Sequence, residues 1–463
     1  MGQNFNRQSL QRQRAIAKQA TKVDANHFFN LLTAPELLGV VEAQLPEHRD
    51  RWYPPTVTLS MFLGQVLSAD GSCQQAVNEA IVHRMLSGMK ISSANTGGYC
   101  SARGRLPQAM VQAVARHIGA SLTLTQPLPQ TWLWRGRHVK LVDGTTVSLP
   151  DTPENQACYP QPCGQAPGVG FPKARIVGIV SLSHGAILEA AMGPCKGKGT
   201  GEHGLLRPLL NTFSRDDVLL ADSYYCSYFL LAELQARGVD VVMEQHGARH
   251  TDFRYGESLG ARDHLMIWHK PEQPAWMSRD EYERHANTLT VREVKVGRKI
   301  LVTTLLSPSA TPKQALGELF TWRWNVELDL RNIKTTLGME TLSCMTPAMC
   351  EKEMWVYLLA YNLIRLLIAQ AAHQESLLPR QLSFKHTLQV WLAWSARQLY
   401  FPGVDNTARL FMLIAQIRVG NRPGRVEPRA VKRRPKEYAR LMLPRREARM
   451  AFINRNRAKM RAA

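Results

Sequence analysis

The stretch FTWRWNVELDLRNIKTTLGME, residues 320–340, predicts the helix around which the fold is organised. At about 100° per residue on an α-helix, its apolar and its charged side chains fall on two neighbouring arcs. The apolar arc holds Leu319, Trp322, Val326, Leu330, Ile333 and Leu337. The charged row holds Arg323, Glu327, Arg331 and Lys334, with Phe320 at its start. We therefore expect one amphipathic helix with a buried apolar arc and a charged row along its edge.

The spacing of the charged row allows two interpretations. Arg323 and Arg331 each stand four residues from Glu327, which on a solvated face gives ion pairs worth a few tenths of a kcal/mol. In the second interpretation the row faces a ligand. The Thr311–Pro312 step is expected to open the helix, with Thr311 as N-cap and Pro312 at the first helical position.

Short apolar runs before this helix predict β-strands. HVKLVD, DVLLAD and VDVVMEQH each predict one strand, and ARIVGIVSLSHGAILEAAMG predicts two strands joined at His184–Gly185. Helical stretches at about residues 201–213 and 226–237 lie between the runs. Interleaved strands and helices predict the α/β class, with a mixed sheet flanked by helices.

Changes in periodicity divide the chain into five parts. The first has helical spacing and is a candidate DNA-binding module, whereas the third has strand-like runs and is interpreted as a β-rich insertion. The predicted parts are a helical N-terminal domain (1–130), the first part of the core (131–245), the β-rich insertion (246–310), a helical second part of the core (311–417) and a basic tail (418–463).

The charge of the chain favours a polyanionic partner. The formal net charge is +21, and residues 418–463 hold sixteen Lys and Arg against three acids. Such a surface gathers phosphate electrostatically, and the tail lacks the clean apolar face of a membrane-binding helix. Nucleic acid is therefore the expected partner, with a merely solubilising tail as the alternative.

The eight cysteines form no CxxC pair and no Cys/His spacing of the kind that zinc sites need, which is typical of a reduced cytosolic protein. The first residues contain no apolar stretch of the kind a secretory signal has. The best membrane candidate, residues 354–372, carries Asn362 and Arg365 within its apolar run, and a central Arg is costly in lipid. We expect a buried core helix there and no membrane contact.

Three acids occupy places where chemistry is expected. Asp143 ends the apolar run VKLV, and Asp222 ends the run VLLA, so both are predicted at the ends of buried strands, where open α/β sites are built. Glu327 on the packed helix is the third. Each has an ordinary alternative, because Asp before Gly is a common turn choice and Asp after a strand often caps a helix.

Convergent carboxylates need a cation to neutralise their repulsion. Oxygen ligands without nearby His or Cys suit Mg²⁺ or Mn²⁺, and two such ions about 4 Å apart support in-line phosphoryl displacement. In this interpretation Glu327 binds metal, and Arg323, Arg331 and Lys334 meet phosphates along the same helix edge. The glycine-rich stretch GPCKGKGTGEHG, residues 193–204, lacks Walker spacing and predicts a turn or a loop near DNA.

Three segments together resemble the acidic regions of IS4-family DDE transposases. They are VDGTTVSLPDTPEN, LLADSYYCSYFLLAEL and LFTWRWNVELDLRNIKTTLGME, and the resemblance runs through most of residues 50–375. The family's third region has Tyr, two residues, Arg, three residues, Glu, six residues and Lys. Phe320, Arg323, Glu327 and Lys334 stand at that spacing, with Phe in place of Tyr.

The resemblance implies an RNase H-like core interrupted by a β-rich insertion before the third acid. It implies that Asp143, Asp222 and Glu327 bind two Mg²⁺ or Mn²⁺ ions, and that Arg323 and Lys334 contact transposon ends. It further implies a DNA transposase that cleaves insertion-sequence ends, joins them to target DNA and acts as a homodimer. The expected location is the bacterial cytoplasm, in association with the nucleoid.

Two positions depart from the family pattern. Phe320 lacks a phenolic oxygen for a phosphate, and Ser223 follows the second acid where close relatives would have Arg. A catalytically decayed DNA-binding relative and a metal-dependent nuclease without strand transfer are therefore the alternative functions.

Overall fold

The computed structural model of the 463-residue chain describes residues 35–45, 52–398 and 407–462, with gaps at 87, 125–127, 165, 167, 198 and 421–441, and the single positions 11 and 14. Most of the predicted N-terminal domain before residue 35, and most of the first half of the basic tail, lie outside the described residues.

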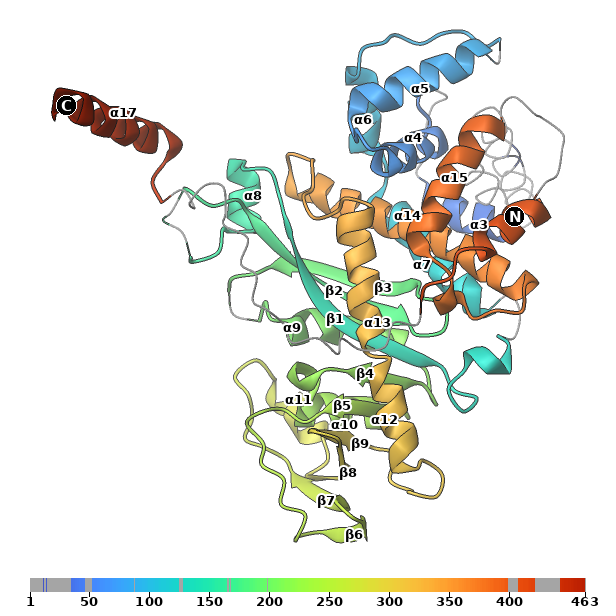
Figure 1. Cartoon of the computed structure of the whole chain (residues 1–463), viewed down its shortest axis with the longest axis vertical. Coiled ribbons are helices and arrows are strands. Elements are labelled where there is room, and N and C mark those ends of the chain that lie inside the picture. Colours follow the sequence, from blue (N-terminus) through green and yellow to red (C-terminus); the bar gives the residue numbers. More distant parts are fainter. Residues whose placement is uncertain are drawn as a thin grey trace.

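One open nine-stranded sheet forms the centre of the molecule (Figure 1), with strand order β3-β2-β1-β4-β5-β9-β8-β7-β6. Strands β1, β4 and β5 are parallel, whereas β2 runs antiparallel to both β1 and β3. The predicted α/β class and mixed sheet are confirmed. The strands are β1 (Val139–Ser148), β2 (Lys173–Ser181), β3 (Ile187–Pro194), β4 (Val218–Ala221), β5 (Asp240–Glu244), β6 (Glu257–Gly260), β7 (Asp263–His269), β8 (Thr288–Val296) and β9 (Lys299–Thr303).

The strands between residues 246 and 310 continue this sheet. Strand β9 pairs antiparallel with β5, in the register Val242↔Thr303, and β8, β7 and β6 follow as a meander. The sequence predicted β7, β8 and β9 but neither β6 nor the short helix α11 (Arg279–Arg284). Strand β6 has a mainly exposed burial pattern, so it lacks the apolar alternation by which strands are recognised.

The expected single helix over residues 311–337 is three segments. They are α12 (Lys313–Thr321), α13 (Trp324–Arg331) and a π-helical turn (Asn332–Thr336), and the N-cap is Pro312 rather than Thr311. Between α12 and α13 the backbone bonds span three residues, as in Trp322 N–H to the Leu319 carbonyl at 3.0 Å. This tighter winding shifts the side chains off the α-helical arcs.

As a result, the predicted apolar arc is only partly correct. Leu319, Val326, Leu330, Ile333 and Leu337 are buried as expected. Trp322, by contrast, is 46% exposed, and Phe320 from the charged row is only 8% exposed.

Helix α14 (Pro347–Gln374) is the buried core helix that the sequence predicted. By length and composition it is apolar enough to span a membrane, but 83% of its apolar window is buried inside the protein. It packs against α7 (Gln108–Leu124), α4 (Pro55–Leu67) and α16 (Thr407–Ala415). Its polar residues are bonded inside the fold; Asn362, for example, accepts from the Ile187 amide at 2.8 Å.

The other helices surround the sheet and α14 (Figure 1). α4, α5 and α6 lie together at one end of the molecule, beyond α14, and α17 projects away from the body. These remaining helices are α3 (Pro35–Ala43), α5 (Cys73–Leu86), α6 (Gly97–Arg105), α8 (Pro153–Cys158), α9 (Glu202–Leu206), α10 (Tyr228–Ala236), α15 (Phe384–Gln398) and α17 (Arg445–Ala462).

Candidate functional site

Two of the predicted acids stand at the same level on neighbouring strands. The parallel register pairs Leu141 with Leu220, so Asp143 and Asp222 each lie two residues beyond that pair. Asp222 follows the last residue of β4, as expected. Asp143, however, lies inside β1 rather than at its end, because residues 144–148 continue the strand by pairing with β2 after β4 has stopped.

Each of these carboxylates accepts a local backbone hydrogen bond. Asp143 Oδ1 accepts from the Gly144 amide at 2.8 Å, and Asp222 Oδ1 accepts from the Tyr224 amide at 2.9 Å. Asp222 therefore does cap the turn after β4, which was the ordinary alternative for an acid at that position. These bonds orient the side chain of Asp143 within β1 and that of Asp222 after β4.

Burial and several charged neighbours shift the pKa of Asp143. Burial raises the pKa of Asp143 to about 6, and the negative charges of Asp222 and Glu202 add to the rise. The Gly144 amide and the Arg323 guanidinium lower the pKa of Asp143. Asp143, Asp222, Glu202 and Arg323 are thus close enough to interact, and a cation among the carboxylates would relieve their repulsion.

The third predicted acid is connected to this pair through Arg323. Helix α13 packs against β1, and Arg323 Nη2 lies 2.7 Å from Glu327 Oε1. The side chains of Arg323 and Glu327 are 16% and 35% exposed, respectively, so the pair is partly shielded from water. The same Arg323 lowers the pKa of Asp143, so its guanidinium interacts electrostatically with that aspartate as well as with Glu327.

A buried ionic network fixes α13 in place. Asp329, two residues after Glu327, is fully buried and forms ion pairs with Arg365 of α14 and with Arg380. Arg380 Nη1 is 2.7 Å from Asp329 Oδ2, and Tyr361 Oη donates to Asp329 Oδ1 at 2.9 Å. Arg380 also donates to the carbonyls of residues 181 and 182, where β2 ends, at 2.8 and 2.7 Å.

Sequence reasoning missed Asp329, although a signal was present. It lies three residues after Val326 and four before Ile333, which places an acid on the apolar arc. An opposite charge on another apolar helix, Arg365, was its natural partner. Asp329 therefore belongs to the support of the site.

The predicted DNA-contacting residues differ in their exposure. Arg331 is exposed, Lys334 is half-buried in the π-helical turn, and neither has an ion-pair partner among the described residues. Arg323 is held by Glu327. Phe320 is buried, and Lys299 Nζ lies over the face of its ring, 5.0 Å from the ring centre.

Glu202 is the second residue that sequence reasoning missed. It is the first residue of α9, at the end of the glycine-rich stretch 193–204 that predicted only a loop. Tyr225 Oη donates to Glu202 Oε2 at 2.9 Å, and Arg175 Nε lies 3.9 Å from Glu202 Oε1. No sequence signal marked it, because its closeness to Asp143 arises only when α9 packs on the sheet.

The donor set suits a hard divalent cation. Asp143, Asp222 and Glu327 offer only carboxylate oxygens, which Mg²⁺ and Mn²⁺ prefer. Within the described residues, no three His, Cys, Asp or Glu side chains already surround one metal position. Glu327, the third acid, is engaged by Arg323 in an ion pair of 2.7 Å.

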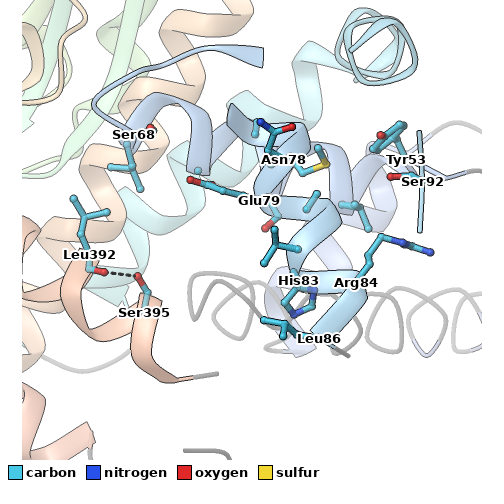
Figure 2. A pocket seen from close by; sticks show the side chains of 18 of the residues that line it. Tyr53, Ser68, Asn78, Glu79, His83, Arg84, Leu86, Ser92, Leu392 and Ser395 are labelled. Atoms are coloured by element: carbon cyan, nitrogen blue, oxygen red, sulfur yellow. Dashed lines mark hydrogen bonds between the residues drawn. The ribbon is translucent and has the colours of Figure 1, made fainter. Parts of the chain in front are cut away.

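A cavity of about 540 Å³ lies elsewhere, in the helical part of the molecule. Figure 2 shows its lining from α4, α5 and α15, with Glu79, His83 and Arg84 on one side and Leu392 and Ser395 on the other. Its remaining lining is mostly apolar. It contains none of the predicted site residues.

Comparisons with known proteins find transposases. Residues 134–363 match the family model described as "Transposase DDE domain". The chain is 28% identical over 419 residues to the transposase InsG for insertion sequence element IS4 of Escherichia coli strain K12, covering 87% of this chain and 91% of that protein. The cryo-EM structure of a piggyBac transposase synaptic complex with hairpin DNA matches 83% of this chain and 82% of its own, with a TM-score of 0.39 and 10% identity.

Proposed function

The chain belongs to the IS4-type DDE transposases, a family of DNA-cleaving and DNA-transferring enzymes, and from this premise we propose that Asp143, Asp222 and Glu327 are its catalytic acids. The observation that supports this most directly is the parallel register of β1 and β4, which sets Asp143 beside Asp222. Helix α13 against β1, with Glu327 held by Arg323, supports the third assignment.

These acids would hold divalent cations, which we propose are two Mg²⁺ or Mn²⁺ ions. When bound, such ions activate a nucleophilic oxygen and stabilise the leaving oxygen of a phosphodiester. The chain's own contribution is to orient the two aspartates through the Gly144 and Tyr224 amides. A cation at Glu327 would compete with Arg323 for that carboxylate and would leave the guanidinium free for a phosphate.

DNA would run along the edge of α13. We propose that Arg323, Arg331 and Lys334 contact the phosphates of the transposon end, as the family pattern implies. The exposure of Arg331 and the free ammonium of Lys334, which has no carboxylate partner in the described part of the chain, support this placement. Phe320 is proposed to act indirectly, through the cation–π contact between its ring and the Lys299 ammonium.

We propose that the chain has the five parts predicted from its sequence. Strands β1–β5, with α12–α14, would form an RNase H-like core, and 246–310 would be the insertion that extends its sheet. Residues 1–130 and the basic tail 418–463 would bind DNA outside the catalytic centre. We further propose a homodimer that pairs two ends in the bacterial cytoplasm.

The test is cleavage and joining of the element's own ends. Purified protein is incubated with DNA carrying the flanks of its gene, with Mg²⁺ or with EDTA. Joined products distinguish a transposase from a nuclease that only hydrolyses, and binding without any cleavage would favour the decayed relative.

Lys334→Ala is expected to weaken end binding about three- to tenfold and to reduce the slope of log affinity against log salt by about 1. The reason is that one phosphate contact is lost while every metal ligand remains. Binding is measured by gel shift in EDTA at several salt concentrations. Lys385→Ala, exposed on α15, is the matched control. An unchanged salt slope for Lys334→Ala would place this lysine away from the DNA.

A further inference from the structure

Glu202 lies between β1, which carries Asp143, and the turn after β4, which begins at Asp222. On one side it meets Gly144, the neighbour of Asp143. A Cβ added to Gly144 would stand 2.3 Å from Glu202 Cδ and 2.5 and 2.8 Å from its two carboxylate oxygens, which is far inside van der Waals contact. The carboxylate therefore rests directly on the backbone of β1, in a space that only glycine leaves open.

On its other side Glu202 contacts the turn that follows Asp222. Tyr225 is fully buried, and its hydroxyl donates to Glu202 Oε2 at 2.9 Å. Burial and the Glu202 charge raise the pKa of Tyr225, so the phenol keeps its proton and remains a donor at neutral pH. One carboxylate thus contacts both β1, at Gly144, and the turn after β4, at Tyr225.

His203, next to Glu202, contacts the same turn after β4. Its Nε2 lies 2.8 Å from the Tyr224 carbonyl oxygen, and its ring centre lies 5.1 and 5.5 Å from the rings of Tyr224 and Tyr225. Thr200, two residues before Glu202, is hydrogen-bonded to β2, because Arg175 Nη1 donates to the Thr200 carbonyl at 2.8 Å. The start of α9 is therefore held from both directions.

We propose that Glu202 is a positioning residue, whose carboxylate between Gly144 and Tyr225 fixes the spacing of Asp143 and Asp222 for metal binding. The inference rests on the proposed function of those aspartates. Glu202 itself does not bind the metal, because its two oxygens face the Tyr225 hydroxyl and the Arg175 guanidinium. Without it, the turn after β4 loses its connection to β1 and the aspartates lose their fixed separation.

The test measures Mn²⁺ binding by electron paramagnetic resonance of the free ion, alongside cleavage of end DNA at increasing Mg²⁺. Glu202→Ala is expected to raise the Mn²⁺ dissociation constant about tenfold and to raise the Mg²⁺ requirement of cleavage in parallel. Glu202→Gln is expected to stay within about threefold of the unmodified protein, because the amide oxygen still accepts from Tyr225. Tyr225→Phe, which removes the same bond from the other side, should resemble Glu202→Ala.

Controls separate positioning from other roles. Glu233→Ala, which breaks a partly exposed ion pair between α10 and Arg237, should change neither Mn²⁺ binding nor cleavage. Equal losses in Glu202→Gln and Glu202→Ala would make Glu202 a metal ligand and overturn the positioning role. Unchanged Mn²⁺ binding in Glu202→Ala would overturn it as well. If the unmodified protein neither binds Mn²⁺ nor cleaves, the aspartate assignment fails and the inference fails with it.

Discussion

Asp143→Asn and Asp222→Asn proteins are expected to bind end DNA normally and to cleave it at least about a thousandfold more slowly. Each substitution replaces a charged oxygen ligand by a neutral amide, and the loss of metal-assisted charge stabilisation is worth several kcal/mol. The local backbone bonds survive, because an amide oxygen can accept from the Gly144 or the Tyr224 amide as the carboxylate does. Cleavage rates in Mg²⁺ and gel shifts in EDTA are the measurements.

The matched control is Asp151→Asn. Asp151 is exposed, and the Gln156 side-chain amide donates to its Oδ1 at 2.8 Å, a bond that asparagine can preserve. It should cleave at the unmodified rate. A rate within tenfold of normal for either catalytic variant would remove that residue from the site. Glu327→Gln belongs to the same series and should also abolish cleavage.

Asp329→Ala is expected to lower the free energy of unfolding by about 3–5 kcal/mol. Arg365 and Arg380 would lose their shared carboxylate while their side chains stay 5% and 17% exposed, and Tyr361 would lose its acceptor. Removing one partner of a buried pair costs more than the pair contributes, because a buried charge stays uncompensated. Denaturant unfolding followed by circular dichroism measures the loss.

The comparison for Asp329→Ala is Glu233→Ala, which breaks the partly exposed pair with Arg237 and should cost less than about 1 kcal/mol. Because Asp329 anchors α13, its variant should also cleave poorly even where it remains folded. A cost below about 1 kcal/mol for Asp329→Ala would mean that the network does not hold the helix.

Much of the fold could be predicted from local patterns in the sequence. Continuous apolar runs marked β4 and β5, and the turn at residues 184–185 marked the hairpin of β2 and β3. Asp222 was correctly expected directly after β4. These features depend on a strand's own residues, so a single sequence is sufficient to find them.

The rest depends on contacts between distant segments. Asp143 could not be placed inside a strand, because the extension of β1 arises from pairing with β2. The turn that exposes Trp322 follows from backbone bonds that an ideal helical wheel ignores. Glu202 reaches Gly144 only through the packing of α9.

The most direct measurement of the central claim is end cleavage by the purified protein in Mg²⁺ and in EDTA, with Asp143→Asn beside it. We expect nicked or broken ends and joined target products in Mg²⁺, neither product in EDTA, and neither from the variant. Cleavage that continues in EDTA, or that Asp143→Asn performs at the normal rate, would contradict a metal-dependent site built on these acids.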